Sequence, residues 1–307
     1  MNIQIQNLSK SYGFQKAVDD ISFEVKTGEI LGFLGPNGAG KTTTMKMITN
    51  YVNMDGGEVF IGGKSVKNGD LRKHIGYLPE HNPLYDEMPV MDYLGFCAAL
   101  QGMAKSQIGE RMKEMIRVCG LDIEKHKRIR ELSKGYRQRV GLAQAMIHDP
   151  EILILDEPTT GLDPNQIVEI RELIKKLGKE KTVILSTHIL PEVEATCDRI
   201  LIINRGKIVA DGSPETLRKQ AQGQQVLRIR IEGGDQTAIF NALKELPSVA
   251  LVDFLDQSQN RFEVQSKPDQ TSNRAVFDLC VKNNWYITEM IPFETRLEDI
   301  FRDLTMN

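Results

Sequence analysis

The residues from Gly35 to Thr42 have the types and spacing that bind phosphate groups. They read Gly-Pro-Asn-Gly-Ala-Gly-Lys-Thr and follow a short apolar run, residues 28–35, typical of a buried strand. Glycines let successive backbone N–H groups converge on phosphate oxygens, and a helix that begins near Lys41 adds positive potential at its N-terminus. Lys41 would reach the β- and γ-phosphates, and Thr42 would coordinate Mg²⁺. This spacing predicts a nucleotide site; the weaker alternative is a glycine turn that caps an ordinary helix.

Two adjacent carboxylates form a second candidate element of the same site. Residues 152–155 are an apolar run typical of a buried strand, and Asp156 and Glu157 follow it directly. Because open α/β sheets bind ligands at the carboxyl ends of their strands, we expect Asp156 to hold Mg²⁺ and Glu157 to orient and polarise an attacking water. The alternative is a solvated acidic turn before Pro158. The sequence contains no Asn-Lys-x-Asp motif of the guanine-selecting kind, which favours ATP over GTP.

The elements that must position these residues follow from the apolar patterns. Residues 2–7 alternate as a strand, and strand-like runs return at 152–155 and 182–186, with a helical stretch at about 165–179 between them. Long helical patterns from about residue 89 to 148 predict a helical subdomain inserted into an α/β core.

The C-terminal part of the sequence predicts a second, smaller domain. A polar stretch, residues 218–225, has the character of a linker. Beyond it the pattern predicts a βαββαβ order, typical of a split-βαβ domain. The predicted strands are 226–232, 249–255, 261–265 and 285–291, and the predicted helices are 236–245, 270–283 and a closing helix at about 296–304. We expect Phe277, Trp285 and Phe293 to supply part of its core.

Composition limits the classes of function. The chain has 307 residues, with 39 basic and 42 acidic side chains, so its charge does not favour nucleic acid or an anionic membrane surface. No apolar run approaches the roughly 18 residues of a membrane span, and the first residues do not have the pattern of a secretory signal. The cysteines are far apart and form no Cys-x-x-Cys pair, which argues against zinc and disulfides. We expect a cytoplasmic protein that reaches a membrane only by docking.

Further motifs across about residues 1–220 occur in the order found in the ATP-binding cassette (ABC) family. The segment Leu132-Ser133-Lys134-Gly135-Tyr136 resembles the family signature LSGGQ, in which a serine and a glycine at a helix start present a hydroxyl and N–H groups to an anion. Residues 161–163 resemble the D-loop, and residues 185–188 resemble the segment that ends in the switch histidine. Outside this family context, the signature segment would be an ordinary helix N-cap.

The resemblance implies a fold and a set of site residues. The fold is the P-loop NTPase ABC cassette, a mixed-sheet α/β core with an inserted helical subdomain at about 89–148, over residues 1–220, followed by a small α+β accessory or regulatory domain over 226–307. ATP would contact Tyr12, Val18, Gly35, Pro36, Asn37, Gly38, Ala39, Gly40, Lys41, Thr42 and Thr43. The catalytic residues would be Glu157 and His188, Asp163 would be the D-loop aspartate, and Mg²⁺ would be held by Thr42, Glu80 and Asp156. Residues Ser133, Lys134, Gly135 and Tyr136 would bind the γ-phosphate held by the other subunit, so that two chains enclose two ATP molecules.

One residue departs from the family pattern. Glu80 stands after Gly76-Tyr77-Leu78-Pro79, where the family has the Q-loop glutamine. A carboxylate can still approach Mg²⁺, but it adds charge where an amide is neutral. The sensing role of this loop is therefore open.

The whole-chain pattern, including residues 132–145 and 294–301, is similar to the ATPase subunits of ABC-2-type exporters. This similarity implies an ATPase that pairs with a second copy or a homologous subunit, serves an integral membrane permease on the inner face of the membrane, and binds no nucleic acid. The alternative is a soluble ABC ATPase that acts on ribosomes or DNA, although neither a second phosphate loop nor extended heptads occur. A regulator without turnover is a third interpretation, against which Glu157 and His188 argue.

Overall fold

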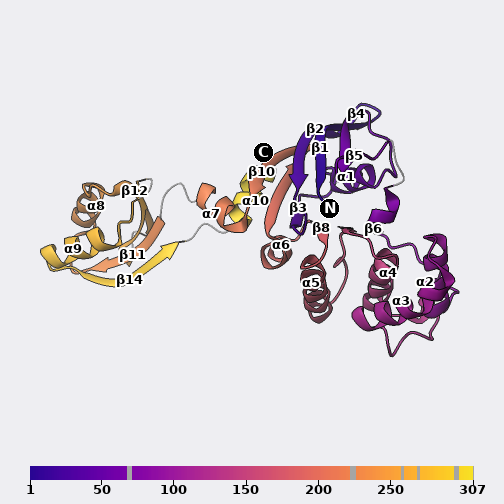
Figure 1. The fold of residues 1–307 in the computed structure, drawn as a ribbon. Helices are drawn as coiled ribbons and strands as arrows, with labels where there is room; N and C mark the ends of the chain where they lie inside the picture. Colours follow the sequence, from indigo (N-terminus) through magenta and orange to yellow (C-terminus); the bar gives the residue numbers. More distant parts are fainter. Residues whose placement is uncertain (68–70, 222–225, 257–258, 268–269, 294–296, 307) are drawn as a thin grey trace. The chain divides into compact units, whose positions relative to one another are not determined.

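The computed structural model describes the chain except for residues 68–70, 222–225, 257–258, 268–269, 294–296 and 307. It divides into two compact units, Met1–Pro214 with Leu304–Asn307, and Glu215–Asp303. Figure 1 shows the order of the elements along the chain. Each unit has its own hydrophobic core.

The first unit contains a six-stranded mixed sheet. Its order is β10-β9-β3-β8-β7-β6, and all neighbours are parallel except β10 and β9. The strands are β3 (Ile30–Leu34), β6 (Ile75–Leu78), β7 (Ile152–Asp156), β8 (Thr182–Thr187), β9 (Arg199–Asn204) and β10 (Lys207–Gly212). Every residue of β3, β7 and β8 is buried, as expected for central parallel strands that are covered on both faces. The prediction of buried strands from these three apolar runs is thereby confirmed.

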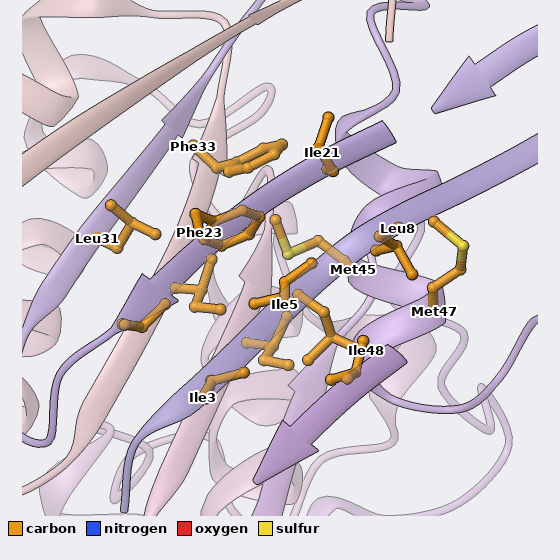
Figure 2. Close-up of a cluster of buried hydrophobic side chains, with 14 of the residues drawn as sticks. Ile3, Ile5, Leu8, Ile21, Phe23, Leu31, Phe33, Met45, Met47 and Ile48 are labelled. Carbon is orange, nitrogen blue, oxygen red and sulfur yellow. The ribbon is translucent and has the colours of Figure 1, made fainter. Parts of the chain in front are cut away.

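An antiparallel sheet in the order β2-β1-β4-β5 lies over the phosphate-loop helix. It comprises β1 (Ile3–Tyr12), β2 (Gln15–Val25), β4 (Gly56–Ile61) and β5 (Lys64–Ser65), and the helix is α1 (Lys41–Ile48). Figure 2 shows how the side chains of β1, β2, β3 and α1 meet in one apolar cluster. Because Met45, Met47 and Ile48 are fully buried there, α1 is fixed firmly behind the loop that precedes it.

Three helices fill the stretch for which the sequence predicts helices, residues 89–148. They are α2 (Val90–Leu100), α3 (Lys105–Val118) and α4 (Lys134–Met146), and they lie together in Figure 1. Short 3₁₀ helices occur at Arg72–His74 and Ile129–Glu131. The first unit also contains α5 (Pro164–Gly178) and α6 (Leu190–Thr196). Helix α7 (Pro214–Ala221) begins at the boundary between the two units.

The second unit has the predicted βαββαβ order. Its strands β11 (Val226–Glu232), β12 (Val249–Asp256), β13 (Arg261–Ser266) and β14 (Tyr286–Phe293) form an antiparallel sheet in the order β12-β13-β11-β14. Helices α8 (Gln236–Lys244) and α9 (Asn273–Asn283) contribute to the same buried cluster as β11 and β13, so both cover one face of this sheet. The last helix is α10 (Leu297–Met306).

The structure corrects two expectations for the C-terminal part. Residues 218–221 of the expected linker belong to helix α7, and residues 222–225 lie outside the described residues. Phe277 is 57% exposed and supplies no core, whereas Trp285 packs against the core and the side chain of Phe293 is not described. The residues Leu304–Asn307 group with the first unit, where the amide of Asn204 donates a hydrogen bond to the Leu304 carbonyl at 3.0 Å.

Candidate active site

The phosphate-loop segment connects β3 to α1. Gly40 precedes α1 with a φ of 109°, and a Cβ at this position would meet the backbone carbonyl of Ala17, so only glycine fits. Lys41 is the first residue of α1 and is 6% exposed. Its ammonium donates hydrogen bonds to the carbonyls of Gly35 at 2.8 Å and Pro36 at 3.3 Å. The loop therefore curls around the lysine at the N-terminal end of a helix, where an anion is favoured.

The register of the parallel strands brings the predicted residues together. Leu34 of β3 is paired with Thr187 of β8, and Ser186 of β8 is paired with Asp156 of β7. The carboxyl ends of β3, β7 and β8 consequently lie at one edge of the sheet. Residues that are far apart in the sequence, in the phosphate loop, after β7 and after β8, meet at that edge.

Asp156 is completely buried at the end of β7. One carboxylate oxygen, Oδ1, accepts hydrogen bonds from the Ser186 hydroxyl and from the Thr42 hydroxyl, the latter at 3.2 Å. The other oxygen, Oδ2, is buried and has no hydrogen-bond partner among the described residues. Burial raises the pKa of Asp156 above its ordinary value, and the negative charges of Glu80 and Glu157 add to this effect, while the two hydroxyl hydrogen bonds oppose it. Among the described residues this carboxylate therefore has only hydroxyl partners, and a positively charged ligand would be favoured beside it.

Glu157 is held between a lysine and a histidine. It is 5% exposed, and its Oε1 lies 3.4 Å from the Lys41 ammonium. Its Oε2 lies 2.9 Å from Nδ1 of His188 and accepts a hydrogen bond from the Thr160 hydroxyl at 3.2 Å. The backbone of Glu157 has a φ of 50°, an unusual conformation for a residue with a side chain and one that is frequent in functional sites. The structure thus joins the predicted residues Lys41, Glu157 and His188.

The residues predicted to lie beside adenine, Tyr12 and Val18, are in the β1–β2 hairpin. Tyr12 is 53% exposed at the end of β1, and the ammonium of Lys10 lies 5.7 Å from the centre of its ring. Asp55 orients Lys10 through an ion pair of 2.7 Å. Val18 is fully buried in the core between the sheets, so its part is to support the hairpin from below.

The signature residues begin helix α4. The hydroxyl of Ser133 accepts a hydrogen bond from the Tyr136 N–H at 3.4 Å, which makes Ser133 the N-cap of the helix. Gly135 is buried against the side chain of Gln166, and a Cβ there would collide with it. Asp163 caps α5 by accepting a hydrogen bond from the Gln166 N–H at 2.9 Å, so the D-loop and the signature segment adjoin. Within the described part of the chain, no hydrogen bond or ion pair links these signature residues to the phosphate loop.

Glu80 is exposed and lines a cavity of about 850 Å³. Thr42 and Asp156 line the same cavity, together with Gln144 of α4 and His148, which follows that helix. The charge of Glu80 contributes to the raised pKa of Asp156, so its carboxylate is close enough to act on the predicted metal residues. No group of three or more His, Cys, Asp or Glu side chains suited to a metal ion occurs among the residues that the structure describes.

Sequence reasoning missed two polar residues of this region. Ser186 hydrogen-bonds Asp156, and both its carbonyl and its hydroxyl accept from the Glu157 N–H, at 3.1 and 3.2 Å. Glu192, in α6, binds the hydroxyl groups of Thr159 and Thr187. Ser186 could have been found because it belongs to the motif that ends in His188. Glu192 has no such signal, because its contacts depend on how β7 and β8 are paired.

Comparison with known proteins places the chain in a family. The family model described as "ABC transporter" matches residues 18–160. The uncharacterized ABC transporter ATP-binding protein YxlF of Bacillus subtilis (strain 168) is 34% identical over 302 residues, which cover 97% of this chain and 98% of that protein. The Nod factor export ATP-binding protein I of Rhizobium sp. (strain N33) is 36% identical over 245 residues, which cover 79% of this chain and 80% of that protein.

Solved structures agree with this result. A structure of an ATP-binding subunit of an ABC transporter has a TM-score of 0.65 and 31% identity, and the match covers 72% of this chain and 93% of that one. The dimeric structure of MJ0796, a bacterial ABC transporter cassette, has a TM-score of 0.64 at 24% identity, covering 69% of this chain and 98% of that one, and it supports the fold. The sheet edge described above carries the phosphate loop, the paired carboxylates and the histidine in one place, as an ATP-hydrolysing cassette requires. The chain therefore belongs to the family of ABC transporter ATP-binding proteins and is an ABC-type ATPase, the ATP-binding subunit of an ABC transporter.

Proposed function

We propose that this chain hydrolyses Mg-ATP at the sheet edge formed by β3, β7 and β8, with Glu157 as the residue that orients and polarises the attacking water. One observation carries the proposal: Glu157 contacts Lys41 at 3.4 Å and His188 at 2.9 Å. Lys41 and His188 are the two side chains expected to bind the γ-phosphate, so the carboxylate between them lies where that phosphate and a water would meet.

The residues at this edge suit Mg²⁺. The unpartnered, buried Oδ2 of Asp156 is an oxygen of the kind that binds Mg²⁺, and Thr42 and Glu80 line the cavity that Asp156 also lines. We propose that these three residues hold the ion, directly or through water. When bound, Mg²⁺ neutralises charge on the phosphates of the nucleotide. The remaining ATP contacts would come from Tyr12 and the phosphate-loop residues Gly35, Pro36, Asn37, Gly38, Ala39, Gly40 and Thr43, while Val18, buried in the core, would support the hairpin that carries Tyr12.

A second copy of the chain, or a homologous subunit, would complete the site. The signature residues Ser133, Lys134, Gly135 and Tyr136 lie at the start of α4 and form no hydrogen bond or ion pair with their own phosphate loop within the described residues. Ser133 and Lys134 are exposed, so the N-terminal end of α4 is free to meet the γ-phosphate of another subunit. Asp163, beside them, would lie at the same interface. The related cassette MJ0796 is described as a dimer.

Dimer formation can be measured by light scattering. The Glu157→Gln variant, which should bind ATP and hydrolyse it slowly, is expected to double its mass at saturating Mg-ATP, and a further Ser133→Ala change should weaken this dimer. If Glu157→Gln stays monomeric under these conditions, both alone and with its membrane partner, the two-subunit site is wrong.

We further propose that the chain energises an exporter, bound on the inner face of the membrane to a separate permease. The support is the export function named for a relative that is 36% identical. No helix in the described part of the chain is long and apolar enough to cross a membrane, so the membrane path would belong to another protein. The net charge of −3 does not favour nucleic acid as a partner.

Affinity purification from membranes in mild detergent tests this proposal. We expect an integral membrane protein to copurify in stoichiometric amount and to change the ATP turnover of the chain. Recovery with ribosomes or DNA and no membrane protein would contradict it.

A narrower proposal concerns the process that is served. The segments 132–145 and 294–301 resemble those of the gliding-motility transporter ATPase GldA. Deletion of the gene for this chain should then abolish surface spreading of its host, with rescue by the wild-type chain and not by Glu157→Gln. Normal spreading of the deletion strain would exclude this role and leave the exporter proposal intact.

A further inference from the structure

Glu192 is a buried carboxylic acid with no assigned role. It lies in the first turn of α6 and is 3% exposed. Its Oε2 accepts hydrogen bonds from the hydroxyl of Thr159 at 2.7 Å and from that of Thr187 at 3.1 Å. Thr159 and Thr187 are themselves 2% and 0% exposed, and the other carboxyl oxygen, Oε1, has no partner among the described residues. Burying a carboxyl with an unsatisfied oxygen is unfavourable for stability, so stability alone does not explain this residue.

The two threonines belong to the two segments that carry the proposed catalytic pair. Thr159 lies two residues after Glu157, and Thr187 immediately precedes His188. Apart from the direct contact of 2.9 Å between Glu157 and His188, Glu192 is a single side chain that binds both segments at once. These hydrogen bonds lie in the protein interior, because Glu192 and both threonines are buried.

Both segments have a backbone that needs such support. Glu157 has a φ of 50°, a strained conformation that persists only when surrounding contacts impose it. After His188, the N–H of Ile189 turns back to the Thr187 hydroxyl at 3.1 Å, and that hydroxyl is the group that Glu192 accepts from. The chain on each side of the Glu157–His188 contact is therefore attached to the same carboxyl group.

We propose that Glu192 is a positioning residue for ATP hydrolysis, which fixes the separation of Glu157 and His188 by holding Thr159 and Thr187 on one oxygen atom. The inference rests on the proposed role of Glu157. Without the carboxyl group, Thr159 and Thr187 lose their shared hydrogen-bond partner. Ser186 still links the ends of β7 and β8, but the turns beyond them are held less firmly, and the attacking water loses its fixed orientation. Binding of ATP is unaffected, because the phosphate loop and Lys41 are held by other contacts, including the hydrogen bonds of Lys41 to Gly35 and Pro36.

The chain offers matched variants for a test. Glu192→Gln keeps an oxygen that can accept both hydroxyls, whereas Glu192→Ala removes it. Thr159→Val keeps the shape of the side chain and removes one of the two hydrogen bonds. Thr196→Val is the control, since Thr196 lies on the same helix, is 6% exposed, and has a hydroxyl without a partner in the described residues.

Two readouts separate positioning from mere packing. The first is steady-state ATP hydrolysis with an independent measurement of ATP affinity. We expect Glu192→Ala and Thr159→Val to lower kcat by about 10- to 100-fold, the range that small misplacements cause, while the Kd for ATP changes less than about twofold. Glu192→Gln and Thr196→Val should retain most of the wild-type kcat.

The second readout is the ¹H–¹⁵N NMR signal of the His188 imidazole, assigned through loss of that signal in His188→Asn. It reports the contact with Glu157 directly and does not depend on Glu157 being catalytic. We expect this signal to shift in Glu192→Ala and Thr159→Val and to remain in place in Glu192→Gln and Thr196→Val.

The proposal is overturned if folded Glu192→Ala or Thr159→Val keeps the wild-type kcat and His188 signal, or if Thr196→Val loses as much activity as they do. Thr159→Val decides the question if Glu192→Ala does not fold. Should Glu157→Gln retain wild-type turnover, the proposed function fails, and the NMR signal still shows whether Glu192 holds the pair.

Discussion

At the scale of single residues, the site gathers negative charge on adjacent buried side chains. Asp156 and Glu157 are adjacent and 0% and 5% exposed, and the charge of Glu80 acts on Asp156 as well. The ammonium of Lys41 pairs with Glu157 at 3.4 Å, and Asp156 is left with hydroxyl partners on one oxygen only. Such a site is unfavourable for the free protein and favourable for a ligand that brings positive charge.

Asp156→Asn should therefore stabilise the metal-free and nucleotide-free protein near neutral pH. Because the folded-state pKa of Asp156 is raised above its ordinary value of 3.8, its ionised form is disfavoured in the fold relative to the unfolded chain. This penalty is absent below pH 3.8, where the carboxyl is protonated in both states, and it develops as the pH rises through the folded-state pKa. In EDTA we expect a higher Tm for the variant near neutral pH, and a smaller difference as the pH falls.

Two controls accompany this measurement. Asp163→Asn removes an exposed carboxylate and keeps a good N-cap for α5, so its Tm should stay close to wild type. Added Mg²⁺ should raise the Tm of the wild type and leave that of Asp156→Asn unchanged. A lower Tm for Asp156→Asn in EDTA near neutral pH would show that its hydroxyl contacts outweigh its charge.

At the scale of elements, the conformation of the phosphate loop depends on glycine at particular positions. Gly38 and Gly40 both have positive φ, 79° and 109°. A Cβ at Gly38 meets nothing within 4 Å, whereas a Cβ at Gly40 would meet the carbonyl of Ala17. Gly40 is thus constrained by both conformation and space, and Gly38 by conformation alone.

We expect Gly40→Ala to disturb the protein far more than Gly38→Ala. A positive φ costs a residue with a side chain about 1–2 kcal/mol, which corresponds to a fall of a few degrees in the Tm for Gly38→Ala. Gly40→Ala must in addition displace β2 or the start of α1, so its Tm should fall further and its ATP affinity should drop by about tenfold or more. Thermal melting and calorimetric titration with ATP give the two quantities. Equal losses for the two variants would mean that the contact with Ala17 relaxes at no cost.

The sequence predicts the central elements better than their connections. Strands β3, β7 and β8 are readable because strands buried on both faces consist of apolar residues throughout. Residues 218–221 were expected in a linker because they are polar, yet the preceding Pro214 and Glu215 are typical of a helix start, and the helix α7 includes them. Phe277 follows the buried Val276 on α9 and so faces solvent, although its apolar character predicts a core position.

The site itself was predictable as a set of motifs and not as a set of contacts. Spacing alone identifies Lys41 and the pair Asp156 and Glu157, since each motif is continuous in the sequence. The hydrogen bonds of Ser186 and Glu192 depend on β8 lying between β3 and β7, which no local pattern shows. The sequence likewise does not show that Oδ2 of Asp156 is buried without a hydrogen-bond partner among the described residues.

At the scale of the whole molecule, two compact units with separate cores occur in one chain. We propose that residues 1–220 are the ATP-hydrolysing cassette, with its helical subdomain at about 89–148, and that residues 226–307 form an accessory domain that regulates or orients the dimer. The second unit has a buried cluster of its own, which includes Leu227, Ile229 and Phe262, so it can fold without the cassette. Residues Leu304–Asn307 group with the first unit, within which the Leu304 carbonyl accepts a hydrogen bond from the Asn204 amide.

Truncation after Ala221 should leave a folded cassette that still binds ATP, with altered turnover or dimer lifetime. The matched variant is Asn204→Ala in the full chain, which removes the contact with Leu304 and keeps both units. If Asn204→Ala changes turnover in the same direction as the truncation, the last turn transmits part of the effect. Circular dichroism and ATP titration check the fold of the truncated chain. An insoluble product, or one that does not bind ATP, would place the C-terminal region within the cassette core.

The turnover of the Glu157→Gln variant shows whether this chain hydrolyses ATP through Glu157. The amide keeps the size of the side chain and removes the charge that polarises the attacking water, while Lys41 and the phosphate loop remain to bind the nucleotide. We expect the Kd for Mg-ATP to stay within a fewfold of wild type and the turnover to fall on the order of 10²-fold or more. Wild-type turnover in a folded Glu157→Gln protein that binds ATP would contradict the assignment of the catalytic carboxylate.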